Sequence, residues 1–209
     1  MQSRVHRKRD TRARIIESAS RTIRCAGFDG VTVVNVMASI GRTHGGFYEY
    51  FPRDLLLVEA FEATSVSGNA AIAARARSLR ETRSSLIEAF VAAYLHREHL
   101  LDRENGCAIA TLISQIPQQS AAIQHAGVVR SRALASLVLS FLPPMTSAPQ
   151  AGWIASQLVG ALQMARTAGD VESGIAHMDS AREFILACHA ASFGQFGRSS
   201  VDAVVVDAA

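Results

Sequence analysis

The residues best suited to recognition chemistry lie together at positions 41–51, which read Gly-Arg-Thr-His-Gly-Gly-Phe-Tyr-Glu-Tyr-Phe. The hydroxyl, imidazole and guanidinium groups of this run can donate hydrogen bonds to phosphate oxygens or to base edges. The adjacent glycines Gly45 and Gly46 would cost an isolated helix about 2 kcal/mol relative to alanine, so close approach of a partner explains them better than helix stability does. The run therefore indicates contact with a nucleic acid.

Local signals place this run on the third of three short helices. Apolar residues recur on one face from about 11 to 26, and Gly27 is expected to end that first helix. Thr32 stands where it can cap a second helix, which Gly41 stops after two turns, and Thr43 can cap the third. A tight glycine turn between the second and third helices is typical of a helix-turn-helix, whose third helix can enter a major groove. Many small helical cores share this outline, so the outline alone is not specific.

The residues of the third helix make the interpretation more specific. The run at 41–51 closely resembles the recognition element of TetR/AcrR family transcriptional regulators, which typically read Gly-x-Thr/Ser-x-Gly-x-aromatic or Leu-Tyr-x-His/Tyr-Phe there. Residues 27–33, Gly-Phe-Asp-Gly-Val-Thr-Val, resemble the family's link between its first two helices. The resemblance covers about residues 10–62, and Thr-His-Gly-Gly-Phe-Tyr is similar to one broad subgroup. It implies a helix-turn-helix DNA-binding domain at 8–54 and a regulator, usually a repressor, of transcription.

The resemblance and the side-chain chemistry together predict which residues contact double-stranded DNA. We expect His44 and Gly45 at base edges, with the hydroxyl groups nearby donating to phosphates. The predicted DNA-contacting residues are Thr32, Arg42, Thr43, His44, Gly45, Gly46, Tyr48, Tyr50 and Arg53. The alternatives are a packed aromatic at Tyr48 and an ordinary surface histidine at His44. The family usually has a lysine shortly after this element, whereas this chain reads Phe-Pro-Arg-Asp, so either Arg53 replaces that lysine or the contact is absent.

Positive charge is concentrated in the same part of the chain. Residues 1–53 hold ten Arg or Lys against four Asp or Glu, a net charge of +6, whereas the remaining 156 residues hold eleven against fourteen, a net charge of −3. A basic segment attracts the phosphate backbone of DNA. The alternative is a solvated basic tail that only aids solubility.

Beyond position 52 the helical patterns become longer. They fall at about 53–76, 82–101, 106–116, 118–141, 149–168 and 172–192, separated by Gly and Pro breaks. Strand signals are scarce, so we expect an all-α fold of about nine helices. The expected parts after the DNA-binding head are a helical bundle at 55–193 and a flexible tail at 194–209.

The resemblance implies that the bundle forms a homodimer and binds a small-molecule inducer. Dimerisation is expected through the helices at about 149–168 and 172–192, where small residues allow close helix approach. Two heads about one DNA turn apart would then read a palindromic operator. The residues predicted to line the inducer pocket are Phe61, Phe90, Tyr94, Cys107, Ile113, Trp153 and Gln157. Each of them could instead be a plain core residue.

Cys107 supports a second, less favoured route of release. It follows Gly106 at a predicted helix start, where the helix dipole would lower the thiol pKa and favour a reactive thiolate. Modification of that thiol by an oxidant or electrophile would then release the DNA. The alternative is a small buried hydrophobic residue.

Enzymatic functions fit the sequence less well. No dinucleotide-binding, Walker A, nucleophile-elbow or zincin motif occurs, so we expect neither enzymatic activity nor a cofactor. His96 and His99 flank Glu98 at a spacing that could bind a metal, but no third ligand is evident and a solvated helix surface is the favoured interpretation. An architectural DNA-binding protein that responds to no ligand is a further alternative.

Compartment signals favour the cytoplasm. Cys25, Cys107 and Cys188 lack the spacing of a disulfide framework or a zinc site and suit a reducing compartment. No apolar stretch follows the basic N-terminal residues, and no run approaches the roughly 20 apolar residues of a membrane-spanning helix. We therefore expect no signal peptide and no membrane association.

Overall fold

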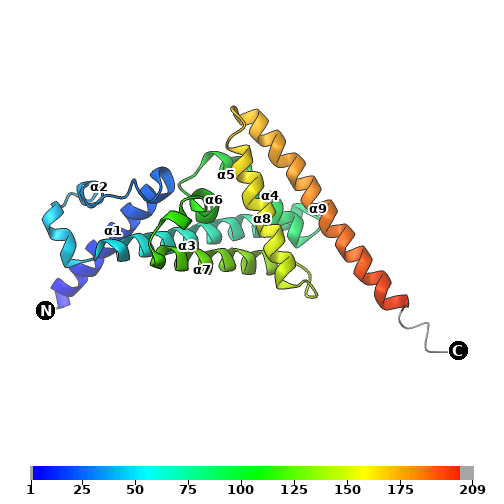
Figure 1. Ribbon diagram of the computed structural model, residues 1–209, viewed down its shortest axis with the longest axis horizontal. Coiled ribbons are helices and arrows are strands. Elements are labelled where there is room, and N and C mark those ends of the chain that lie inside the picture. Colours follow the sequence, from blue (N-terminus) through cyan, green and yellow to red (C-terminus); the bar gives the residue numbers. More distant parts are fainter. Residues whose placement is uncertain (1, 203–209) are drawn as a thin grey trace.

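The computed structural model describes residues 2–202, apart from the side chains at 2–4, 53 and 191–202. This part contains nine α-helices, three short 3-10 helices and no strand (Figure 1), which confirms the predicted all-α fold. The α-helices are α1 (Gln2–Ala26), α2 (Val33–Ser39), α3 (Arg53–Leu79), α4 (Leu86–Tyr94), α5 (Arg97–Leu101), α6 (Ala108–Leu112), α7 (Ala121–Leu139), α8 (Ala148–Ala165) and α9 (Val171–Asp202). The 3-10 helices are η1 (His44–Glu49), η2 (Arg80–Thr82) and η3 (Ile116–Gln118).

The first and last helices are longer than their sequence patterns predicted. α1 begins at Gln2, ahead of the expected start near Thr11, because the basic run before Thr11 contains no helix breaker and Arg and Lys have good helix propensity. α9 continues to Asp202, past the expected end at 192, since glycines at 194 and 197 weaken a helix by about 1 kcal/mol each without breaking it. The remainder of the predicted tail, residues 203–209, lies outside the described residues.

Two predicted helices are interrupted. The pattern at 82–101 forms α4 and α5, separated at His96, whose backbone is extended and whose imidazole accepts a hydrogen bond from the Glu98 amide (3.2 Å). The pattern at 106–116 forms only the five-residue α6, and η3 follows it around Pro117. Hydrophobic periodicity locates both segments, but it cannot reveal that His96 caps the start of α5.

α1, α2 and η1 form a small head around an apolar core. Ile15 of α1, Val36 of α2 and Phe47 of η1 are all completely buried. Thr32 caps α2 through its hydroxyl, which accepts a hydrogen bond from the Asn35 amide at 3.1 Å, and this prediction is confirmed. The head therefore closes around residues from all three of its helices.

The long helix α3 joins the head to the body. The Ser20 hydroxyl of α1 donates to the Ala60 carbonyl of α3 (3.1 Å), and the Thr64 hydroxyl of α3 donates back to the Ser20 carbonyl (3.2 Å). Both bonds are buried, and Arg12 of α1 forms an ion pair with Glu59 of α3. The head is therefore fixed to the first half of α3.

The body is a layered helical bundle. Figure 1 shows α3 running from the head into the body beside α7, with α8 and α9 crossing at the side away from the head. The aromatic rings of Phe90 and Phe141 meet in its core with their centroids 4.8 Å apart. Within residues 2–202, no helix combines the length and the apolar character needed to cross a lipid bilayer.

A second contact between head and body lies at the end of α1. Gly27 turns the chain with a φ of +73° and ends α1, as predicted. The Phe28 amide then donates to the side-chain oxygen of Gln115 at 3.0 Å, and the Cys25 thiol donates to Glu104 at 3.3 Å. The segment that follows α5 thus touches the head directly.

Replacing Gly27 by alanine should destabilise the protein more than replacing Gly41 by alanine. Both glycines have positive φ, +73° and +69°, which costs alanine about 1–2 kcal/mol. A Cβ atom at position 27 would also clash with the Gln115 side-chain amide, whereas one at position 41 would meet nothing within 4 Å. Displacing Gln115 removes its bond to Phe28, worth about 1 kcal/mol more. Denaturant unfolding of both variants measures the difference, and equal losses would contradict a stabilising role for Gln115.

Candidate nucleic-acid interface and sensor region

The predicted recognition helix is a 3-10 helix rather than an α-helix. η1 spans only six residues and includes two glycines, and short helical pieces of this kind commonly adopt the tighter form. Phe47 anchors it, since its ring is completely buried and stacks on Phe51 with a centroid distance of 6.1 Å. Thr43 holds the capping position with extended backbone, but its side chain makes no capping bond. The Thr43 hydroxyl is therefore not used to start the helix.

Five of the predicted DNA-contacting residues share one exposed surface. Arg42, Thr43, His44 and Gly45 are exposed, and Tyr48 exposes 65% of its surface. The rings of His44 and Tyr48 meet edge to face, 6.1 Å apart. We name these five residues the η1 surface; its groups are the hydrogen-bond donors that phosphates and base edges require. The exposure of Tyr48 disfavours the alternative of a packed aromatic residue.

No described residue explains why glycine occupies two positions of η1. Neither Gly45 nor Gly46 has a positive φ, so alanine could adopt the same backbone at both positions. A Cβ atom at either position would meet nothing within 4 Å. Glycine at these positions therefore leaves space for something outside the described chain.

The remaining predicted contact residues lie at the border of the η1 surface. The Thr32 hydroxyl is occupied in capping α2. Tyr50 is half-buried, and the ammonium group of Lys8 lies 5.8 Å from its ring centroid, which brings a cation from α1 beside η1. The sequence analysis included Lys8 only in the net charge of residues 1–53 and did not predict this contact. Arg53 is the first residue of α3, but its side chain lies outside the described residues, so its replacement of the family's lysine stays a prediction.

Part of the positive charge counted from the sequence serves the fold. Arg12 pairs with Glu59 and its guanidinium lies 4.5 Å from the centroid of the Phe51 ring. Arg14 donates to the Ile40 carbonyl at 3.2 Å, and Arg24 is buried, which lowers its pKa. The charge available to a phosphate backbone is therefore smaller than the net charge of residues 1–53.

The residues predicted to line an inducer pocket fall into two groups. The buried group is Phe61, Phe90, Tyr94 and Cys107, and the more exposed group is Ile113, Trp153 and Gln157. Within the second group, Ile113 borders a groove between α6, α7 and α8, whereas Gln157 borders a groove between α8 and α9. The seven residues predicted to line an inducer pocket therefore do not surround a single cavity.

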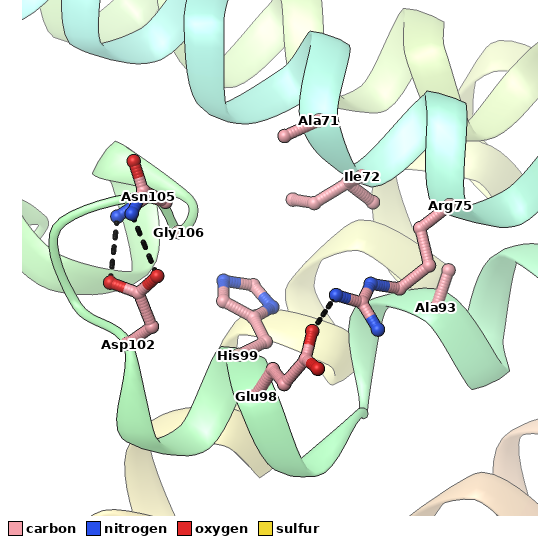
Figure 2. A pocket seen from close by; sticks show the side chains of 9 residues that line it. All are labelled: Ala71, Ile72, Arg75, Ala93, Glu98, His99, Asp102, Asn105 and Gly106. Atoms are coloured by element: carbon pink, nitrogen blue, oxygen red, sulfur yellow. Dashed lines mark hydrogen bonds and ion pairs between the residues drawn. The ribbon is translucent and has the colours of Figure 1, made fainter.

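A small pocket of about 110 Å³ opens between α3, α4, α5 and the segment before α6 (Figure 2). The residues that line it are Ala71, Ile72, Arg75, Ala93, Glu98, His99, Asp102, Asn105 and Gly106. Arg75 pairs with Glu98, and the Asn105 side-chain amide donates to the Asp102 carboxylate at 2.7 Å. Because these polar groups bond to one another, the pocket offers few free partners to a ligand.

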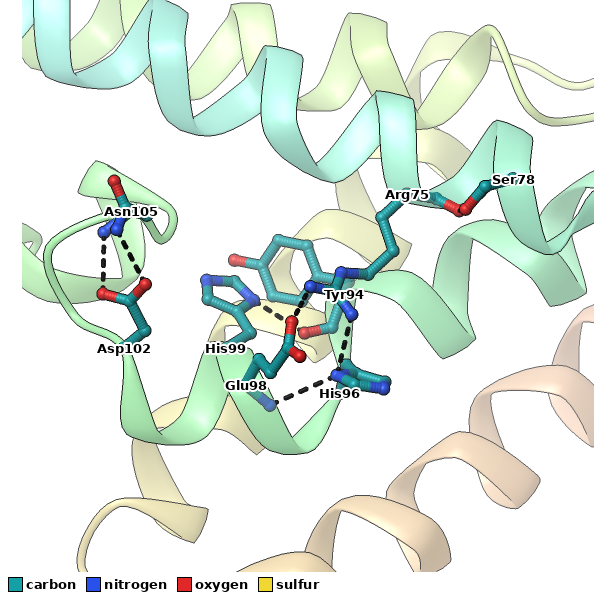
Figure 3. A network of polar contacts seen from close by, with 8 residues as sticks. All are labelled: Arg75, Ser78, Tyr94, His96, Glu98, His99, Asp102 and Asn105. Carbon is teal, nitrogen blue, oxygen red and sulfur yellow. Dashed lines mark hydrogen bonds and ion pairs between the residues drawn. The ribbon is translucent and has the colours of Figure 1, made fainter.

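A buried histidine organises the polar network beside this pocket (Figure 3). His99 Nε2 accepts a hydrogen bond from the Cys107 amide (2.8 Å), so Nδ1 carries the proton and donates to the Tyr94 carbonyl (2.7 Å). Burial lowers the pKa of His99 to about 4, which leaves the ring neutral near pH 7. The prediction that His99 lies on a solvated helix surface is therefore wrong. Both of its ring nitrogens are occupied, so it has none to offer a metal ion.

Cys107 does not have the lowered pKa that the sequence suggested. It stands at the start of α6, but its side chain is buried and interacts with the Tyr94 hydroxyl. Burial raises the pKa of the Cys107 thiol, because removal from water penalises the thiolate more than the amides of a five-residue helix stabilise it. The thiol is therefore protonated at neutral pH, and the expectation of a reactive thiolate is wrong.

Comparison with known proteins identifies the fold. No family model and no curated protein sequence matches the chain. Among solved structures, the reduced form of Escherichia coli NemR matches with a TM-score of 0.66 at 16% identity, covering 84% of this chain and 95% of that one. A RolR complex with the ligand resorcinol matches with a TM-score of 0.52 at 22% identity, covering 87% and 95%.

A candidate TetR-family transcriptional regulator from Mesorhizobium loti MAFF303099 matches with a TM-score of 0.53 at 20% identity, covering 87% of this chain and 98% of that one. The similarity extends over the body as well as the head, since each of these matches covers more than four fifths of both chains. The chain therefore has the fold of TetR-family regulators.

The buried neutral His99 should make stability depend on pH. Its pKa is about 4 in the folded protein and about 6.5 when unfolded, so the unfolded state binds more protons between these values. The contribution is present above about pH 6.5 and is lost as the pH falls, by about 2 kcal/mol at pH 5 relative to pH 7. Denaturant unfolding of the native protein and of His99→Gln at both pH values tests this. The same pH dependence in both proteins would contradict it.

Proposed function

We propose that this protein is a cytoplasmic, sequence-specific DNA-binding transcriptional regulator, a repressor that leaves a palindromic operator when a small-molecule inducer binds. The η1 surface carries the proposal, because its exposed hydrogen-bond donors lie beside Gly45 and Gly46, two glycines that nothing in the described chain requires. The TetR-type fold and the resemblance of residues 41–51 to that family's recognition element support the same function.

In this proposal η1 enters the major groove of the operator. His44 and Gly45 meet base edges, and the hydroxyl groups of Thr43, Tyr48 and Tyr50 donate to phosphates. The flanking contacts come from Thr32, Arg42, Gly46 and Arg53. Because Gly45 and Gly46 have no Cβ atom, the DNA backbone can come close enough to contact the backbone amides of η1.

Reading a palindrome requires two copies of the head, and α8 and α9 are the surface proposed to join them. Trp153 on α8 and Phe184 on α9 expose 45% and 66% of their surfaces, and both belong to the helices predicted to dimerise. A groove of about 570 Å³ separates the two helices and is bordered by Gly160 and Phe184. A second copy of the chain is the occupant that a two-fold symmetric operator requires.

Induction requires a path from body to head. The bonds of Gln115 to Phe28 and of Glu104 to Cys25 connect the segment after α5 with the end of α1. A ligand that binds the body in one arrangement of this segment better than in another would shift the orientation of the head. The resorcinol held by RolR supports a small molecule as effector for this fold. The buried, protonated Cys107 disfavours release by thiol modification.

The glycines of η1 provide the sharpest test of DNA binding. The operator is first selected from genomic DNA fragments, and affinities are then measured by mobility shift. Gly45→Ala and Gly46→Ala should each lower operator affinity about tenfold, since a Cβ blocks the closest DNA contact. Neither substitution should lower the melting temperature, because both positions are open and alanine favours a helix by up to about 1 kcal/mol. Unchanged affinity in both variants, or selection of no discrete site by the native protein, would overturn the proposal.

A charge-matched pair controls for unspecific attraction. Arg42→Gln on the η1 surface should reduce the slope of log affinity against log salt concentration by about one. Arg77→Gln removes the same charge from the exposed surface near the far end of α3 and should leave the slope unchanged. A similar change of slope in both variants would count against a localised interface.

Substitution of Phe184 by arginine tests the dimer. A charge placed in the proposed interface should convert the native dimer into a monomer in sedimentation velocity experiments, because burying an unpaired charge there is unfavourable. Leu86→Arg is the matched control, since Leu86 is an exposed apolar residue on α4. A monomeric native protein, or a Phe184→Arg variant that stays dimeric, would refute this arrangement.

A further inference from the structure

Arg166 is a half-buried cation without an anionic partner. It ends α8, and its guanidinium donates to the His99 carbonyl at 3.0 Å and to the Thr111 hydroxyl at 3.4 Å, both of which are neutral acceptors. No carboxylate among the described side chains lies within ion-pair distance of it. Charges withdrawn from water are normally paired, because desolvation without a counter-charge is costly. The arrangement therefore leaves a positive charge uncompensated.

A second arginine adds to this charge. Arg103 lies close enough to Arg166 for its charge to lower the pKa of Arg166, after the larger effect of burial. Arg103 is exposed and makes no ion pair within the described part of the chain. No described carboxylate lies within ion-pair distance of either of these two neighbouring cations. An anion between them would satisfy both.

Both arginines line one pocket of about 410 Å³ between α5 and the turn from α8 to α9. Its apolar wall comes from Leu100, Leu101 and Val171. The one acidic residue at the rim, Asp170, uses its carboxylate elsewhere: it accepts hydrogen bonds from the amide and the hydroxyl of Ser173, each at 2.8 Å, and so caps α9. The lining therefore combines a net positive charge with an apolar side.

The pocket in Figure 2, which His99 lines, differs in this respect. Its only arginine, Arg75, is already paired with Glu98, and Asp102 is bonded to Asn105. Its polar groups need no ligand. Of these two pockets, the one lined by Arg103 and Arg166 has positive charges that no described carboxylate pairs with.

We propose that Arg103 and Arg166 form a binding site for a small amphipathic carboxylate, with the carboxylate between the two guanidinium groups and the apolar part against Leu100, Leu101 and Val171. The planar guanidinium suits a carboxylate because two N–H groups can donate to its two oxygens. An apolar body of a few carbon atoms matches the apolar wall. The site lies outside the seven residues that the sequence predicted.

The site has a direct connection to the head. Arg166 holds the carbonyl of His99, whose ring accepts the Cys107 amide at the start of α6. Gln115, which lies between α6 and η3, contacts the head through the Phe28 amide. A carboxylate that draws Arg166 toward Arg103 therefore acts on the segment that contacts α1. This role as inducer rests on the proposed function, whereas the binding itself does not.

Isothermal titration calorimetry of the full chain with benzoate tests the site without any DNA. Benzoate should bind, whereas benzamide, which has the same shape without the charge, should not. Inorganic phosphate at equal ionic strength should bind at least about tenfold more weakly, because it lacks the apolar part. Arg103→Gln should weaken benzoate binding by about tenfold, as expected for loss of a charge-assisted hydrogen bond. Arg97→Gln removes the same charge from an exposed position on α5 that does not line the pocket, and should leave the affinity unchanged.

Several results would overturn the assignment. They are no heat of binding with millimolar benzoate, equal affinity for benzoate and benzamide, phosphate binding as tight as benzoate, or equal weakening in Arg103→Gln and Arg97→Gln. Arg166→Lys gives an independent variant that keeps the charge but loses the planar fork, and it should also weaken benzoate if the folded structure is retained in circular dichroism. Because DNA is absent from the titration, failure of this site leaves the operator experiment informative, and the reverse also holds.

Discussion

The packing of α1 against α3 is the constraint on which the other features of the molecule depend. Ser20 both donates to α3 and accepts from it, and these buried bonds fix the register between the two helices. A slip of one residue would leave polar groups unpaired in an apolar core, at a cost of about 1–3 kcal/mol for each group. Arg12 of α1 extends the same packing toward η1, because its guanidinium pairs with Glu59 of α3 and lies over the Phe51 ring. The orientation of the η1 surface is therefore determined by α3.

The η1 surface shows how a short element can be fixed and still present its polar groups outward. η1 is anchored by one buried ring, Phe47, which stacks on Phe51. The exposed residues on the opposite side are therefore not part of its buried core. This division explains why two glycines are tolerated: a six-residue 3-10 helix held by tertiary packing does not depend on intrinsic helix propensity. His44 and Tyr48 stay exposed beside this packed ring.

The junction of α5, α6 and α8 combines polarity with burial. His99 remains neutral because burial lowers its pKa to about 4, and its two ring nitrogens connect α4 to the start of α6. Arg166 remains cationic nearby without a carboxylate partner among the described side chains. A core of this kind has few alternative arrangements, since every change in it must break a buried hydrogen bond. Through Cys107 and α6 this junction is continuous with Gln115, which contacts the head.

The sequence by itself determined the helical class, the three-helix head, the Thr32 cap and the turn at Gly27, because each depends on contacts between residues near in the chain. It also located the run whose exposed polar groups form the η1 surface. Only the tertiary structure decided that η1 is a 3-10 helix, that Arg12 and Arg14 serve the fold, and that His99 and Cys107 are buried. It also decided that Arg103 and Arg166 face one pocket. Ion pairing and the burial of polar side chains depend on residues distant in the chain, and the pKa of a side chain depends on both, so periodicity and spacing carry no signal of them.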